Sequence, residues 1–109
     1  MDSPKIELIK EAALDKKAFD LQVISLKGLA SFTDFLLICS GDSPLQRKAI
    51  VQSISLSLKH GGDPIHHQEG EDGSGWVLLD CYEVIVHVFA PEIRNYYDLP
   101  SIWSGREDR

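Results

Sequence analysis

The most apolar stretch of the chain, GWVLLDCYEVIVHVF at 75–89, also contains two carboxylates and an imidazole. Successive side chains of a β-strand point to opposite faces of the sheet, so a strand pattern sorts these residues into two sets. A β-hairpin that turns at Cys81–Tyr82 places only apolar side chains on one face, namely Val77, Leu79, Val84, Val86 and Val88. We therefore expect this face to lie in the core, beneath helices.

The opposite face of the same hairpin mixes apolar and polar groups. The predicted turn pairs Asp80 with Glu83, and Trp76 with His87. Sheet faces of this composition commonly contact another layer, a second subunit or a partner protein. Core packing alone is the alternative role for Trp76. The pattern predicts a partner-binding set that comprises Trp76, Leu78, Asp80, Glu83, Ile85 and His87.

Helical and strand patterns alternate along the rest of the chain. The helix signals are capping residues followed by a proline in the first turn. They predict helices from Pro4 to near Asp15–Lys17, from Pro44 (capped by Asp42 or Ser43) to Gly61–Gly62, and over Pro91–Tyr97. Apolar runs predict strands over Leu21–Leu26 and Asp34–Ser40, and a short edge strand over Pro64–Gly70. The expected fold is α/β (α+β): a single domain, 1–109, with one mixed sheet of about five strands and three helices packed on it.

Composition and charge restrict the class of partner. The chain of 109 residues has 17 acidic residues against 11 lysines and arginines, a formal net charge of −6. Binding to phosphate backbones is driven by Lys and Arg that displace counterions, so nucleic acid is not expected as the main target. A basic partner, or none, is favoured instead. Because no run of 18 apolar residues occurs, no membrane span is expected.

Cysteine usage and the first residues bear on localisation. Cys39 and Cys81 lie far apart inside apolar runs, so we expect two buried thiols rather than a zinc site or a disulfide framework. The initial MDSPKIELIKEAA has neither the apolar region of a secretory signal nor the arginine-rich character of a transit peptide. These features favour a reducing, cytoplasmic environment.

Three features of the sequence could suggest chemistry, and none fits it. In the predicted hairpin His87 lies roughly 10 Å or more from Asp80, too far to share one ion. His66–His67 with Glu69 resembles a ligand set, yet adjacent strand residues point to opposite faces. The turn at Gly41 is not followed by the paired carboxylates that hold Mg²⁺ in nucleotidyl transfer. We therefore expect no enzyme activity, no metal and no cofactor.

A series of motifs occurs in unbroken order between about residue 4 and residue 103. They are DKKAFD (15–20), TDFLLICSG (33–41), LQRKAI (45–50), EG (69–70), GWVLLD (75–80) followed by VIVHVF (84–89), RNYYDL (94–99) and IW (102–103). In this order the motifs resemble those of the ribosomal silencing factor family, which is also called the Iojap family.

The resemblance implies a function that composition does not indicate. Members of the family bind a ribosomal protein of the large ribosomal subunit, on the face that joins the small subunit. They thereby block subunit joining and lower translation when nutrients are scarce. Organellar relatives act in large-subunit assembly, which is one alternative for this chain; an enzyme of nucleotidyltransferase type is the other. The resemblance also implies a nucleotidyltransferase-like fold without catalytic residues, and a homodimer in the free state.

Three positions depart from the pattern of the family. Leu45 stands where many members carry arginine, and Pro100 where an acid is common. Tyr82 stands where many carry glycine in the hairpin turn. Because a tyrosine is strained at positive φ, we expect this turn to differ in type from one built on glycine.

Overall fold

The computed structural model describes residues 4–28, 33–71 and 73–97 of the chain. The elements occur in the order α1 (Pro4–Asp15), β1 (Phe19–Ser25), β2 (Phe35–Ser40), α2 (Pro44–His60), β3 (His67–Gly70), β4 (Trp76–Cys81), β5 (Val84–Phe89) and α3 (Pro91–Tyr97). Each helix begins at the proline that the sequence indicated, and α2 ends before Gly61 as expected.

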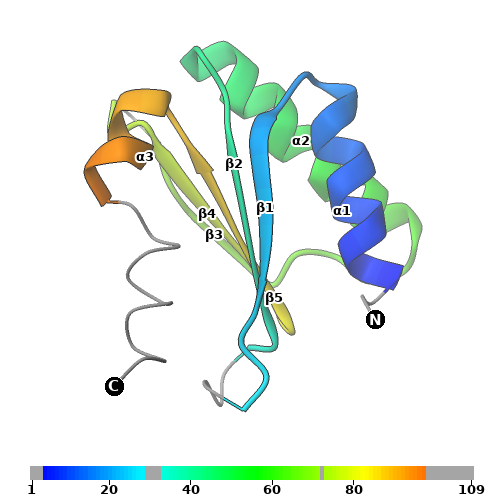
Figure 1. The fold of residues 1–109 in the computed structure, drawn as a ribbon. Coiled ribbons are helices and arrows are strands. Elements are labelled where there is room, and N and C mark those ends of the chain that lie inside the picture. Colours follow the sequence, from blue (N-terminus) through cyan, green and yellow to red (C-terminus); the bar gives the residue numbers. More distant parts are fainter. Residues whose placement is uncertain (1–3, 29–32, 72, 98–109) are drawn as a thin grey trace.

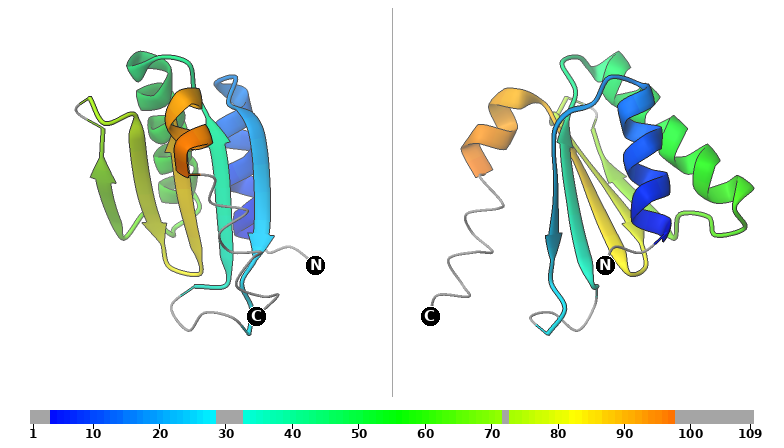
Figure 2. Two further views of the ribbon diagram at one scale, coloured as in Figure 1. Left: turned by 60° about the vertical axis from the view of Figure 1, so that its left-hand side comes forward. Right: turned by 45° about the vertical axis from the view of Figure 1, so that its right-hand side comes forward.

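The five strands form one mixed sheet in the order β1-β2-β5-β4-β3. β2 and β5 run parallel, and the other neighbouring strands are antiparallel. Helices α1 and α2 lie side by side on one face of the sheet, and the short α3 lies on the opposite side (Figures 1 and 2). The predicted architecture of one mixed sheet with three helices is therefore confirmed.

The face of the sheet beneath α1 and α2 forms the main core. The five apolar hairpin residues predicted for this face are all buried there, in one cluster with Ile9 of α1 and Ile54 of α2. Cys39 and Cys81 belong to the same cluster, which confirms them as buried free thiols. Burial raises the pKa of each thiol to about 12, so both stay protonated and unreactive.

A hydrogen-bonded cap fixes the start of α2. Ser43, rather than Asp42, is the N-cap residue, because its Oγ accepts a hydrogen bond from the N–H of Gln46 at 3.0 Å. The Gln46 side chain accepts from the N–H of Asp42 at 2.6 Å and donates to the carbonyls of Lys16 and Lys17. Gln46, in the LQRKAI motif, thus ties the start of α2 to the end of α1.

The β4–β5 hairpin turns one residue later than predicted. Its turn is Tyr82–Glu83, and Cys81 pairs with Val84. Trp76 therefore pairs with Phe89 rather than His87, and Asp80 pairs with Ile85 rather than Glu83. The division of the strand residues between the two faces is unchanged, because the register moved by an even number of residues. Glu83, however, leaves the strand and lies in the turn.

The backbone conformation and the contacts of Tyr82 explain why the hairpin turns at Tyr82–Glu83. Its φ is +69°, so the expectation that the turn would avoid positive φ is wrong. Local contacts offset the strain: the Tyr82 N–H donates to Asp80 Oδ1 at 3.0 Å. The ring packs against His66, with centroids 4.9 Å apart, and lies 5.5 Å from Lys5 Nζ.

Other boundaries differ by a few residues. β1 begins at Phe19 instead of Leu21 and contains a register shift between Phe19 and Gln22, where Asp20 has a φ of +51°. β3 is an edge strand as predicted but begins at His67 instead of Pro64. The IW motif and Pro100 lie outside the described residues. Over the described ranges, the helices are too short or too polar for a membrane crossing.

Candidate interaction face

The residues that the structure describes cover the second face of the hairpin only in part. We call it the Trp76 face; it comprises Trp76, Leu78, Asp80, Ile85, His87 and Phe89. Phe89 is buried in a small cluster with Leu36 and Ile38 of β2, against which Ile93 of α3 packs. Trp76, Leu78, Asp80 and Ile85 are each half-buried, so the described residues leave this part of the face partly open.

A hydrogen bond sets the orientation of the tryptophan. The indole Nε1–H of Trp76 donates to Nδ1 of His87 at 2.9 Å. Burial lowers the pKa of His87 from 6.5 to about 4, so the imidazole is neutral at pH 7. Since Nδ1 accepts, the ring proton is on Nε2. The Phe89 ring packs against both, with its centroid 5.1 Å from Trp76 and 5.7 Å from His87. Trp76 is thus held in one place while part of it remains accessible.

Glu83, which the sequence assigned to this face, points away from it. Its Oε1 accepts a hydrogen bond from Lys5 Nζ of α1 at 3.0 Å. Lys5, only 8% exposed, also pairs with Asp63 at 2.6 Å and donates to the carbonyl of Cys81 at 2.9 Å. Burial alone would lower the pKa of Lys5, but the hydrogen bonds to Asp63 and Glu83 outweigh it and raise the pKa. Glu83 therefore links the hairpin turn to α1. The prediction that Glu83 pairs with Asp80 across the hairpin is wrong.

A second buried cation supports the start of β4. Arg47 of α2 is 4% exposed; its Nε donates to Glu71 Oε1 at 3.0 Å and its Nη1 donates to the Gly41 carbonyl at 2.8 Å. Glu71 Oε2 accepts from the N–H of Gly75 at 3.3 Å, directly before Trp76. Gly41 has no room for a larger residue, because an added Cβ would lie 2.9 Å from Arg47 Cγ.

Sequence reasoning missed both cations. A signal existed for Arg47, because it occupies the apolar stripe of α2 one turn before Ile50 and two turns before Ile54. Lys5 precedes the buried Ile6 in the first turn of α1 and offered no comparable signal.

The histidines that resembled a ligand set do not form one. His67 Nε2 lies 2.8 Å from Glu69 Oε2 on exposed β3, whereas His66 packs against Tyr82. Over the residues that the structure describes, acids, histidines and cysteines nowhere gather in a group that could hold a metal.

Comparison with known proteins assigns the chain to a family. A family described as "Ribosomal silencing factor during starvation" matches residues 1–109. The chain is 36% identical over 101 residues to a ribosomal silencing factor of Chromobacterium violaceum, covering 93% of this chain and 83% of the relative. A crystal structure of a protein from the same bacterium superposes with a TM-score of 0.87 at 35% identity, over 92% of this chain and 83% of that one. A mouse protein named for mitochondrial assembly of the ribosomal large subunit is 29% identical over 104 residues, which cover 93% of this chain and 46% of the mouse protein.

The chain therefore belongs to the ribosomal silencing factor, or Iojap, family, as its motifs suggested. Silencing factors of this family are not enzymes, which agrees with the expectation from the sequence.

Proposed function

We propose that the chain binds the large ribosomal subunit through the Trp76 face and prevents the small subunit from joining. The contact would be with a ribosomal protein on the joining face of the large subunit, and the block would be steric. The observation that carries the proposal is the oriented, partly exposed Trp76, which shares its face with the partly exposed Leu78 and Ile85. An aromatic anchor with apolar neighbours typically provides most of the binding energy of an interface.

The charge of this region supports a basic protein partner. From His60 to Ile93 the sequence contains seven acidic residues and no lysine or arginine. Asp80 lies on the Trp76 face itself, where its carboxylate would attract a cationic partner. Ribosomal proteins carry many lysines and arginines because they bind RNA.

Binding and subunit joining test the proposal together. Trp76→Ala is expected to weaken binding to purified large subunits roughly thirtyfold, the equivalent of about 2 kcal/mol. It should also restore joining of the small subunit in the presence of the factor. Leu56→Ala is the matched control, because Leu56 is an exposed apolar residue of α2. The proposal is wrong if folded Trp76→Ala, checked by a thermal melt, binds as well as the parent.

The name of the mouse relative favours a second function, in large-subunit assembly. Depletion of the protein from its host separates the two. Silencing predicts normal subunits that translate too much during starvation, and assembly predicts immature large subunits during growth.

Further features of the proposal follow from the family. We infer that the chain acts in the cytoplasm as one domain, that it needs no cofactor, and that it forms a homodimer when free. The nucleotidyltransferase-like character of the fold stays a prediction. Analytical ultracentrifugation of the free protein tests the dimer, which would dissociate on dilution.

A further inference from the structure

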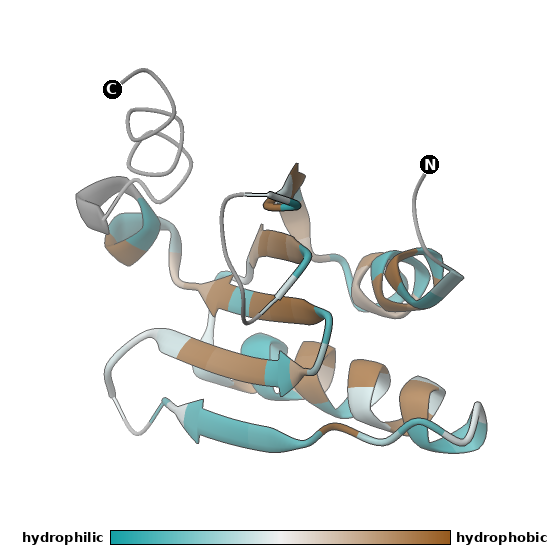
Figure 3. Ribbon diagram, turned by 90° about the horizontal axis from the view of Figure 1, so that it is seen from below, coloured by the Kyte–Doolittle hydropathy of each residue, from teal (hydrophilic) through white to brown (hydrophobic). Residues whose placement is uncertain are grey.

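The two edges of the sheet differ in how they could receive another strand. β1, at one edge, contains the register shift at Asp20, and bulges of this kind protect an edge from pairing. β3, at the other edge, pairs with β4 in unbroken register and consists of His-Gln-Glu-Gly. All four residues are exposed, and none is the lysine or proline that usually blocks an edge. β3 is the hydrophilic strand beside the apolar β4 and β5 (Figure 3).

The backbone of β3 offers hydrogen-bonding groups at this edge. The N–H of Glu71 donates to the carbonyl of Trp76 at 2.7 Å, so the backbone groups of Glu71 face β4. Since backbone groups alternate in direction along an antiparallel strand, those of Glu69 also face β4 and those of Gln68 face outward. An added strand would therefore bond to Gln68.

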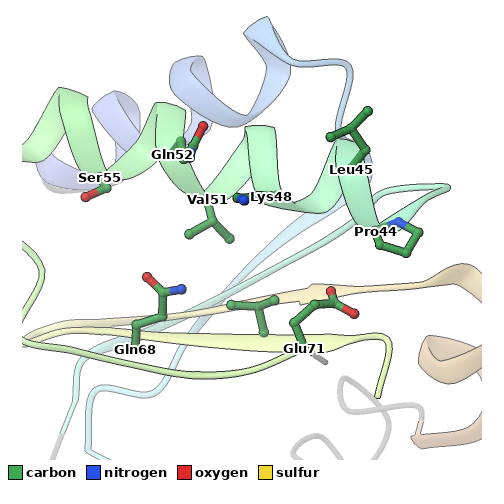
Figure 4. A pocket seen from close by; sticks show the side chains of 9 residues that line it. Pro44, Leu45, Lys48, Val51, Gln52, Ser55, Gln68 and Glu71 are labelled. Carbon is green, nitrogen blue, oxygen red and sulfur yellow. The ribbon is translucent and has the colours of Figure 1, made fainter. Parts of the chain in front are cut away.

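A groove runs along the helix side of the same edge. It lies between α2 and β3–β4 and has a volume of about 600 Å³ (Figure 4). Val51, Gln52 and Ser55 line it from α2 and Gln68 lines it from β3 (Figure 4), and Val77 of β4 also belongs to the lining. Leu45 is 78% exposed at one end of the groove. A strand added to β3 would direct every second side chain into this groove.

The opposite side of β3 is continuous with the Trp76 face. His67 and Glu69 pair with Asp80 and Leu78, so their side chains project to that side. A hollow of about 300 Å³ joins the two, lined by Glu69, Gly70, Ser74, Trp76 and Leu78. A protein seated on Trp76 can therefore reach the edge of β3 across a continuous surface.

Charge indicates what kind of segment the edge would accept. Within the segment that lacks lysine and arginine, Glu71 is paired with Arg47, and Asp63 and Glu83 with Lys5. Glu69, by contrast, has no lysine or arginine partner among the described residues; it lies 2.8 Å from His67 Nε2, and its side chain is 67% exposed. A segment carrying Lys or Arg at the positions beside Glu69 fits this edge better than an acidic or neutral one.

We propose that β3 accepts a basic, extended segment of the large-subunit protein as a sixth strand, with alternate side chains in the groove between α2 and β3. The proposal rests on the proposed function, because it takes its partner from the contact at the Trp76 face. Recognition through an added strand uses main-chain hydrogen bonds for affinity and side-chain pockets for specificity.

Hydrogen exchange by mass spectrometry gives a direct test. Peptides that cover 66–71 are compared between the free protein and the protein bound to purified large subunits. Added-strand pairing predicts slower exchange of the Gln68 amide in the complex. Unchanged exchange of this amide in a saturated complex would overturn the proposal. Protection that rises with the concentration of the free protein, and that subunits do not increase, would assign the edge to a second copy of the chain and overturn it as well.

Two variants separate this contact from the contact at the Trp76 face. Gln68→Pro removes the outward N–H and should weaken subunit binding roughly tenfold, whereas Gln68→Ala keeps the N–H and should bind within about twofold of the parent. Ser55→Trp fills the groove without altering the edge backbone, so it tests the same contact if the proline variant melts early.

The binding results distinguish the added strand at β3 from the proposed contact at the Trp76 face. If Trp76→Ala loses binding while Gln68→Pro and Ser55→Trp, both folded, bind like the parent, the added strand is wrong and the proposed function stands. If Trp76→Ala binds like the parent, the proposed contact face is wrong, whatever the edge variants do.

Discussion

The two faces of the β4–β5 hairpin arise from one alternating sequence pattern but differ in how far the rest of the protein buries them. On the helix side Val77, Leu79 and Val86 are sealed beneath α1 and α2 in the main core. On the other side Trp76 and Leu78 remain half-exposed above a small cluster. The first face is completed by the chain's own folding. The second has a tryptophan that is hydrogen-bonded to His87, and the described residues cover it incompletely, which is the state expected of a surface that binds something else.

Adjacent leucines on opposite faces provide the sharpest test of this difference. Leu79→Ala removes a fully buried side chain and should cost about 3 kcal/mol of unfolding free energy. Leu78→Ala removes a half-buried one and should cost about 1 kcal/mol while weakening subunit binding. Urea denaturation and subunit binding are measured for both. Equal losses of stability would contradict the distinction between the faces.

Acid should weaken the Trp76 face through His87. The pKa of this residue is about 4 in the folded chain and 6.5 as the ordinary value, so the unfolded chain binds the proton first. The stability it contributes is complete above pH 6.5 and is lost as the pH falls toward 4, by up to about 3 kcal/mol.

Urea denaturation from pH 7.5 to pH 4.5 isolates this effect when the parent is compared with His87→Gln. The glutamine keeps an acceptor for the Trp76 N–H but does not titrate. The parent should lose more stability than the variant over this range. Parallel pH profiles would show that His87 is not held neutral by folding.

A substitution of Lys5 tests whether the Tyr82–Glu83 turn is held against α1, on the same side of the sheet as the main core. Lys5→Met keeps the aliphatic stem but leaves Asp63 and Glu83 without their cation, and should cost about 1–2 kcal/mol. The cost is moderate because both carboxylates are half-exposed. Lys10→Met is the control, since Lys10 lies on the same helix and its contact with Glu7 is long, at 3.7 Å. Similar melting temperatures for the two variants would refute an anchoring role for Lys5.

The smallest effect is expected from the charge of Asp80. Asp80→Asn keeps the acceptor for the Tyr82 N–H while removing the charge, so stability should change by less than about 0.5 kcal/mol. Association with large subunits should slow severalfold and depend less steeply on salt. Asp80→Lys, which reverses the charge, should weaken binding further. An unaltered salt dependence for both variants would mean that Asp80 does not steer binding.

The sequence predicted the faces of the hairpin but not its turn. Alternation with period two survives a register error of two residues, so Val77 and Trp76 fell on the correct sides. The turn depended on Tyr82 at positive φ, a conformation that side-chain contacts with Asp80, His66 and Lys5 make possible. Such tertiary compensation is not encoded in local propensity.

Helix boundaries were predicted well because prolines and a capping serine fix them locally. Arg47 was missed for the opposite reason. Its charge can be buried because it bonds to Gly41 and Glu71, which lie 6 and 24 residues away in the sequence. Helical periodicity alone assigns a charged residue to the solvent-exposed face of the helix.

The parallel pairing of β2 with β5 has a consequence for how the protein is made. Phe35 meets Val84, so the middle of the sheet joins residues that are synthesised far apart in time. While α1, β1, β2 and α2 leave the ribosome, the inner edge of β2 has no neighbour until β5 has emerged. Long-range pairing of this kind slows folding and prolongs the exposure of an apolar strand. The central pairing of the sheet can therefore form only after β5 has been synthesised, however early β2 has left the ribosome.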